Sequence, residues 1–160
     1  MNHFPLADDH TEIDALLNKV FAALDKENVE TIYKSLDFFW ARLAMHIRAE
    51  HLHLFPAITN AIETQTTENN GSVPSFDEAQ KAIKDLQNDH NFFMRELLAA
   101  IKRLRELLEN KIIVDFSKEI SDVRESIVSV KHRLEKHNET EETKVFCGLT
   151  RFSINRNAPL

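Results

Sequence analysis

Apolar side chains recur at helical spacing along four long stretches of this chain, and this periodicity limits the possible folds more than any other feature. The stretches cover about residues 8–27, 29–63, 76–110 and 115–149. The apolar sides include Leu17 and Leu24, then Leu36 and Ala57, then Leu97 and Leu108, then Ile127 and Leu134. Only 2 Gly and 4 Pro interrupt the chain, so long helices are favoured. We predict an all-α protein, an antiparallel up-down four-helix bundle.

The breaks between the stretches are marked by turn-forming residues. Residues 66–74, TTENNGSVP, predict the one clear loop, and Ser75 after it is a predicted N-cap. Pro56 predicts that the second helix is kinked or loosened late in its length, because proline lacks an N–H and crowds the carbonyl one turn back. We assign residues 1–150 to one four-helix domain and residues 151–160 to a polar C-terminal tail.

Composition excludes several classes of protein. The net charge of −6 and the lack of a basic stretch give no support to nucleic-acid binding. No apolar run approaches the ~20 residues of a membrane span, and the start MNHFPLADDH lacks the features of a secretory signal. Cys147 is the single cysteine, so an internal disulfide and a Cys₄ zinc site are excluded, and we expect a small buried side chain there. These features predict a cytoplasmic protein without a membrane or nucleic-acid partner.

One histidine falls on the inner side of each predicted helix. These four are His10, His46, His90 and His137. Two of them are followed four residues later by a glutamate, in HIRAE and HNETE. Positions i and i+4 lie on the same face of a helix, so Glu50 and Glu141 point the same way as the histidines before them.

The spacing of these histidines also predicts their depth in the bundle. In an antiparallel hairpin, two residues at one level are equally far from the turn. The midpoint of His10 and His46 is Asn28, and the midpoint of His46 and His90 falls within the 66–74 loop. The midpoint of His90 and His137 falls between residues 113 and 114, close to the third turn. We therefore predict that all four histidines lie at one level.

The other histidines receive different predictions. By angular position His51 and His132 point outward to solvent, and His3 precedes the first helix. His53 falls on the inner side, so it is either a further ligand or a partner of a ligand. The aromatic run Phe38, Phe39 and Trp40 is predicted to be core.

Four buried imidazoles and two buried carboxylates need partners. Left unpaired, such groups cost about 1–3 kcal/mol each, and a pair of metal ions would supply the missing partners. Imidazole with carboxylate suits iron and manganese and, less diagnostically, zinc. A ferritin-like centre would need Glu-x-x-His twice, and this chain has it once, at Glu50 and His53. A metal-free helical interaction module, with the histidines satisfied by hydrogen bonds, is the remaining alternative.

The combined pattern resembles the hemerythrin-like, or HHE cation-binding, family over about residues 6–149. The phrase HLFP after Glu50 is also similar to the second-helix signature of that family. The resemblance implies a four-helix bundle with a non-haem di-iron centre. It also implies the ligand set, in which the two glutamates bridge the ions: His10, His46, Glu50, His90, His137 and Glu141.

Several positions differ from the oxygen-carrying hemerythrins. Met94 stands where a further third-helix histidine is found, and the fourth-helix carboxylate is Glu141 at i+4 rather than an aspartate at i+5. His51 stands where the family often has a second glutamate. Both helix differences resemble the bacterial HHE proteins and the iron-centre repair proteins, but the repair proteins carry a cysteine-bearing N-terminal segment that is lacking here. Four histidines, two bridging glutamates and an oxo or hydroxo bridge would leave one open position on each ion.

These observations predict a protein that binds or senses O₂ or NO. Apolar walls that include Leu43, Met94 and Leu97 would favour small, weakly polar ligands. The alternative is an enzyme-like role, either peroxide reduction or iron donation for the repair of iron centres.

Overall fold

A computed structural model describes residues 5–65, 76–110 and 115–146 of the chain. The predicted 66–74 loop, the Ser75 cap, Cys147 and the 151–160 tail lie outside the described residues. Every described element is helical, and two short elements, η1 and η2, are π-helices. The elements are α1 Pro5–Asp25, α2 Val29–Ala49, η1 Glu50–Leu54, α3 Phe55–Gln65, α4 Phe76–Glu109, α5 Phe116–Thr140 and η2 Glu141–Phe146.

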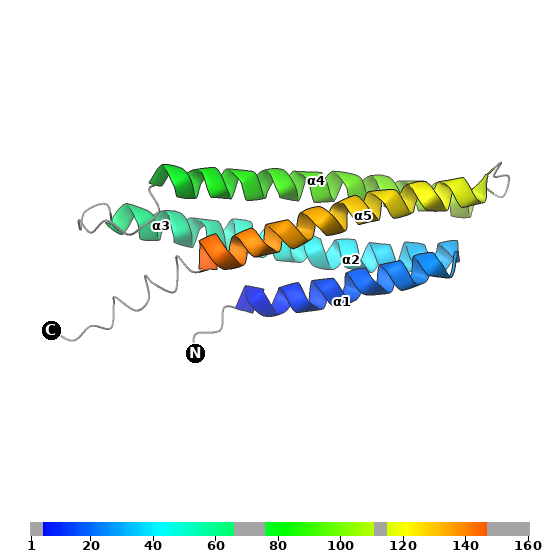
Figure 1. Cartoon of the computed structure of the whole chain (residues 1–160), viewed down its shortest axis with the longest axis horizontal. Coiled ribbons are helices and arrows are strands. Elements are labelled where there is room, and N and C mark those ends of the chain that lie inside the picture. The colour runs from blue at the N-terminus through cyan, green and yellow to red at the C-terminus, as the bar shows by residue number, and fades with distance from the viewer. Residues whose placement is uncertain (1–4, 66–75, 111–114, 147–160) are drawn as a thin grey trace.

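These elements form four helical rods that pack side by side as a bundle (Figure 1). The second rod is α2, η1 and α3 in continuous succession, and the fourth is α5 followed by η2. α1 contacts α2 and α5, and α4 contacts the same two helices, so the rods enclose one interior. The prediction of an all-helical bundle is confirmed. None of the helices in the described part of the chain is long and apolar enough to cross a membrane.

Side-chain caps begin two of the rods. Asn28 accepts a hydrogen bond from the backbone N–H of Thr31 at 2.9 Å, which starts α2. Asp115 accepts one from the backbone N–H of Lys118 at 3.0 Å, which starts α5 one residue later than predicted. α1 ends at Asp25 rather than at residue 27, and Glu27 after it takes a positive φ of 50°.

A wide helical turn begins at each of the two predicted glutamate ligands. η1 begins at Glu50 and η2 begins at Glu141, so the chain winds more slowly there than an α-helix does. Pro56 was predicted to kink or loosen the second helix, and the structure shows a loosened, π-helical turn, η1, just before it. At η1 the wide turn is compatible with Pro56, which has no N–H and whose ring would press on the carbonyl one α-turn back, whereas η2 forms without a proline.

The interior contains two apolar clusters. The main cluster fills most of the bundle and is built from all four rods, with Phe39, Leu43, Phe93 and Leu97 among its fully buried members. A smaller cluster lies among the second, third and fourth rods. It consists of Leu54, Phe55, Ile58, Leu86 and Val145.

Some predicted core residues are exposed. Phe38 is 61 % exposed although Phe39 is buried, because consecutive residues of a helix point about 100° apart. Trp40 is partly buried against the main cluster. Ala57 is exposed because the slower winding of η1 rotates later residues away from their predicted side. Leu108 is 40 % exposed near the end of α4, and its neighbour Leu107 packs against the main cluster instead.

Candidate metal centre

The structure brings the six predicted ligands together in one buried layer. Their relative exposure lies between 0 and 4 %, and they are His10, His46, Glu50, His90, His137 and Glu141. On the last three rods this layer separates the main apolar cluster from the smaller one, for example with His90 between Leu86 and Phe93 on α4. Apolar packing on both sides excludes water and raises the strength of electrostatic interactions within the layer.

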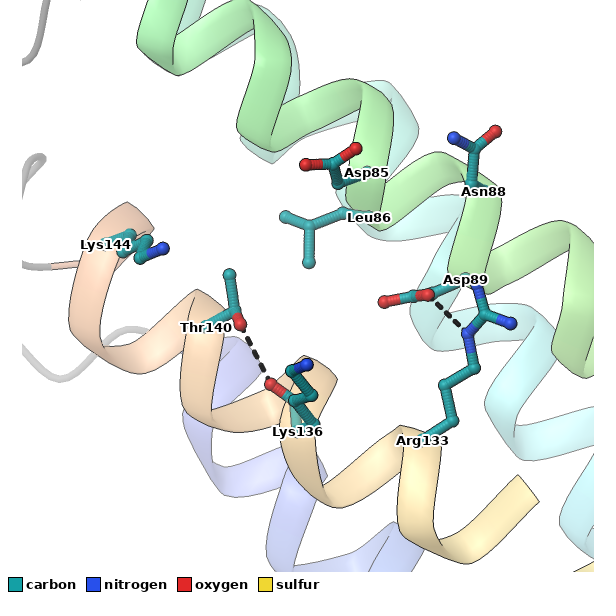
Figure 2. Close-up of a pocket in the computed structure, with 8 residues that line it drawn as sticks. All are labelled: Asp85, Leu86, Asn88, Asp89, Arg133, Lys136, Thr140 and Lys144. Carbon is teal, nitrogen blue, oxygen red and sulfur yellow. Dashed lines mark hydrogen bonds and ion pairs between the residues drawn. The ribbon is translucent and has the colours of Figure 1, made fainter. Parts of the chain in front are cut away.

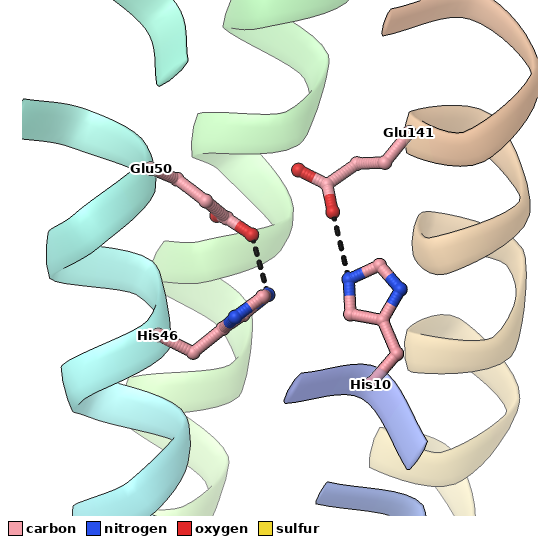
Figure 3. Close-up of side chains that lie close together, drawn as sticks. All are labelled: His10, His46, Glu50 and Glu141. Atoms are coloured by element: carbon pink, nitrogen blue, oxygen red, sulfur yellow. Dashed lines mark hydrogen bonds and ion pairs between the residues drawn. The ribbon is translucent and has the colours of Figure 1, made fainter. Parts of the chain in front are cut away.

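One group of ligand atoms comes from α1, α2 and the two π-helices (Figure 3). His10 Nε2 lies 3.1 Å from Glu141 Oε2, and His46 Nε2 lies 2.6 Å from Glu50 Oε1. The imidazole rings of His10 and His46 meet edge to face with their centroids 5.0 Å apart. One ligand atom from each of the four residues lies within 4.8 Å of the others, a spacing that can surround one metal ion.

A second group consists of Glu50, His90 and His137. His90 Nε2 lies 2.8 Å from Glu50 Oε2 and 3.2 Å from His137 Nε2. The two rings have centroids 4.8 Å apart. Glu50 therefore belongs to both groups, with one carboxylate oxygen toward each, whereas Glu141 belongs only to the first.

Most of the unsatisfied polar atoms in the described core belong to these two groups. Among the described residues, five buried side-chain atoms lack a hydrogen-bond partner, and four are His46 Nε2, both carboxylate oxygens of Glu50, and Glu141 Oε1. The short contacts of Glu50 with His46 and His90 do not have hydrogen-bond directions. Such atoms cost about 1–3 kcal/mol each unless a partner is present. Nitrogen and carboxylate donors aimed at a shared centre fit transition-metal ions, which supply that partner.

Each of the four histidines turns Nε2 inward and presents Nδ1 to another side chain. His46 Nδ1 lies 3.3 Å from Asp9 Oδ2, and His137 Nδ1 lies 3.3 Å from Asp89 Oδ2. A neutral imidazole that donates from Nδ1 has an unprotonated Nε2, which is the form that binds a metal ion. These aspartates therefore orient the rings and fix their tautomer for metal binding.

The remaining two histidines have different partners. His10 Nδ1 lies 3.2 Å from Glu142 Oε1, and His90 Nδ1 lies 2.9 Å from His51 Nε2. His51 is exposed as predicted, but the prediction of a purely solvated side chain is wrong, because its ring contacts both His90 and Phe55. His53 was predicted to face inward and is exposed instead. The wide turn that begins at Glu50 accounts for this change of face.

Both aspartates also hold an arginine. Arg42 Nη2 lies 2.6 Å from Asp9 Oδ1, and Arg133 Nε lies 2.6 Å from Asp89 Oδ1. Each arginine stands four residues before a histidine that its aspartate contacts, so an Arg–Asp–His chain of interactions occurs twice. Sequence reasoning missed these outer residues. The signal was present, because an aspartate directly precedes both His10 and His90.

Comparison with known proteins agrees with this geometry. The family model for the hemerythrin HHE cation binding domain matches residues 5–149. The chain belongs to the hemerythrin HHE cation-binding domain family. No curated protein and no solved structure matched it. Membership supports a metal-binding role for the buried histidine and glutamate groups of this hemerythrin-family chain.

The electrostatics of the hemerythrin-like centre favour the binding of a cation. Burial and the neighbouring His90 lower the pKa of His137 to about 4, so this imidazole is neutral at pH 7. Burial alone would raise the pKa of Glu50, but the nearby nitrogens of His46 and His90 lower it by more. Burial and the Glu50 carboxylate raise the pKa of Glu141, against the hydrogen bond it accepts. A metal cation would stabilise both carboxylates in their ionised form.

A polar pocket of about 560 Å³ approaches this centre from the surface between α4 and the fourth rod (Figure 2). Asp89 lines the pocket and is the residue that contacts His137 Nδ1. Arg133, which pairs with Asp89, and two lysines, Lys136 and Lys144, contribute positive charge to its lining. The pocket brings solvent to the outer side of the second ligand group.

Proposed function

We propose that this chain is an antiparallel up-down four-helix domain, within residues 1–150, that binds two iron ions and through them a small oxidant or diatomic ligand, O₂ or NO. The proposed ligands are the six buried residues, which are His10, His46, Glu50, His90, His137 and Glu141. Manganese and zinc are the expected substitutes, because they accept the same nitrogen and oxygen donors.

The observation that carries this proposal is the orientation of the histidines. His10, His46 and His90 turn Nε2 toward a carboxylate, and His137 turns Nε2 toward His90 Nε2. The layer is closed by apolar residues, and four of its atoms lack hydrogen-bond partners. Hydrogen bonding within a metal-free module does not explain this, because the two oxygens of Glu50 lie 2.6 and 2.8 Å from imidazole nitrogens and yet make no hydrogen bond of regular geometry. Iron bound here would supply redox chemistry and coordination positions for a small ligand.

The protein side chains would control what reaches the centre. Leu43 and Leu97 are buried in the main cluster, and Met94 is partly buried against it, so an apolar wall stands on one side of the ligand layer. Phe93 meets the His137 ring edge to face at 5.4 Å, which restricts movement of that ring. Such surroundings exclude bulky and strongly polar compounds and admit a diatomic molecule.

Metal content tests the first part of the proposal. Anaerobic loading with Fe²⁺, followed by desalting and elemental analysis, is expected to give about two irons per chain. His90→Ala and Glu141→Ala each remove a ligand and are expected to lower bound iron by about half or more. Glu30→Ala is the control, because Glu30 is exposed and pairs with Lys34. Full iron occupancy in both ligand variants would show that His90 and Glu141 are not metal ligands. Absence of bound metal in the wild-type protein after loading would favour the metal-free interaction module.

Exposure of the iron-loaded protein to O₂, NO and H₂O₂ tests the second part. Reversible changes in the absorption spectrum with O₂ or NO, without consumption of further ligand, are expected for a binding or sensing protein. Steady-state consumption of peroxide would instead support the alternative of peroxide reduction. Transfer of iron to an iron-free acceptor protein, faster than loss to a chelator alone, would support iron donation.

A further inference from the structure

The two halves of the chain surround the centre with equivalent residues. The sequence Arg-Leu-x-x-His-x-x-x-Glu occurs at residues 42–50 and again at residues 133–141. The dipeptide Asp-His occurs at residues 9–10 and again at residues 89–90. In three dimensions the Arg–Asp–His interactions repeat with the same distances, 2.6 Å and then 3.3 Å. The Arg–Asp–His interactions are therefore equivalent at the two ligand groups.

The residue that follows each repeated glutamate breaks this equivalence. Glu142 follows Glu141 and places a carboxylate oxygen 3.2 Å from Nδ1 of His10. His51 follows Glu50 and places an imidazole nitrogen, Nε2, 2.9 Å from Nδ1 of His90. Glu142 and His51 occupy corresponding positions of the repeat, and each contacts Nδ1 of a proposed histidine ligand, one with a carboxylate and the other with an imidazole.

A carboxylate and an imidazole affect a metal-binding histidine differently. A carboxylate that accepts the Nδ1 proton increases electron density on the ring and makes Nε2 a stronger donor. An imidazole acceptor carries no charge and does this less. The first group also contains two carboxylates of its own, Glu50 and Glu141, whereas the second contains only Glu50.

We propose that the two metal positions are unequal, so that the position at His10 and His46 fills first and the position at His90 and His137 fills second and empties first. This inference rests on the proposed function, since it requires two ions at the centre. Glu142 and His51 act through His10 and His90 as positioning residues. A substitution at Glu142 or at His51 is therefore expected to change the affinity of one metal position and leave the affinity of the other unchanged.

Stepwise titration of metal-free protein with Zn²⁺, in competition with a chromophoric chelator, measures both affinities. Wild type is expected to show two steps that differ by about 10-fold or more. His51→Glu supplies the missing carboxylate and is expected to strengthen the weaker step by about 10-fold, with the tighter step unchanged. Glu142→His is expected to weaken the tighter step by a similar factor.

Matched variants separate this effect from net charge and from packing. His132→Glu makes the same change of charge as His51→Glu at a side chain that is 73 % exposed on α5, and it is expected to leave both steps unchanged. His51→Gln removes the ring contacts with His90 and Phe55 without adding charge, and it is expected not to strengthen binding. Glu142→Gln keeps a hydrogen-bond acceptor, so the affinity of its tighter Zn²⁺ binding step should lie between those of wild type and Glu142→His. Circular dichroism verifies that each variant is folded.

Mössbauer spectroscopy supplies a second measurement that a change in folding does not imitate. One equivalent of ⁵⁷Fe²⁺ is expected to give a single quadrupole doublet, and two equivalents a second doublet that alone shifts in His51→Glu. Two equal binding steps in wild type, or equal shifts of both doublets in His51→Glu, would overturn the inference while leaving the di-iron proposal intact. Failure to bind any metal would instead contradict the proposed function.

Discussion

Replacing Glu50 by alanine is expected to remove both metal ions from the protein, the largest loss that any single substitution at this centre should cause. Glu50 is the one residue common to both ligand groups, with Oε1 2.6 Å from His46 Nε2 and Oε2 2.8 Å from His90 Nε2. Its loss takes a carboxylate from both positions and leaves the histidines of both groups without a shared anion. Bound iron should fall from about two per chain to well below one, as measured by elemental analysis after anaerobic loading.

Glu141→Ala is the informative comparison for this experiment. Glu141 is equally buried but belongs only to the first group, so about one iron per chain should remain at His90 and His137. Glu50→Gln keeps the volume and removes the charge, and it should also lose most of the iron. Equal iron retention by Glu50→Ala and Glu141→Ala would show that Glu50 does not serve both positions.

Phe39→Ala is expected to lower the free energy of unfolding by about 3–5 kcal/mol, which is the range for truncating a fully buried aromatic residue. Phe39 has no exposed surface and lies in the main apolar cluster, so truncation leaves a cavity. Its neighbour Phe38 is a matched control on the same helix, because it is 61 % exposed. Phe38→Ala should change the free energy of unfolding by no more than about 0.5 kcal/mol.

Urea denaturation of the metal-free variants, followed by circular dichroism, measures both values without a contribution from bound metal. A similar m-value in the three proteins would allow the midpoints to be compared directly. If Phe38→Ala were the more destabilising substitution, the buried and exposed faces of α2 would be assigned wrongly in this segment. His46 lies two turns after Phe39 on the same face, so its inward position would then be wrong as well.

The sequence predicted the rods and the inner residues because an α-helix has a constant angle and rise for each residue. Constant rise explains why the midpoint of His10 and His46, at residue 28, falls beside the start of α2 at Val29. Constant angle explains why one inward histidine was found correctly on each rod, and why Glu50 was placed on the same side as His46. Beyond that residue the π-helical turn changes the angle, and the faces assigned to His53 and Ala57 were consequently wrong.

The outer residues were missed for a different reason. Asp9 and Asp89 each contact a histidine on the next rod rather than the histidine beside them in the sequence. Such a contact depends on the separation and rotation of two packed helices, which a periodicity count along one helix does not contain. His51 was assigned to solvent by its angle alone, yet a long enough side chain at the margin of a face reaches a neighbouring rod.

The duplicated Arg–Asp–His arrangement has an evolutionary consequence. A helical hairpin that carries one copy of these residues would complete the centre only by pairing with a second hairpin, and in a symmetric pair every substitution appears on both sides. In a single polypeptide that constraint is absent, since each half can mutate separately. His51 and Glu142, at corresponding positions of the two halves, are a difference that a symmetric pair of identical hairpins could not contain.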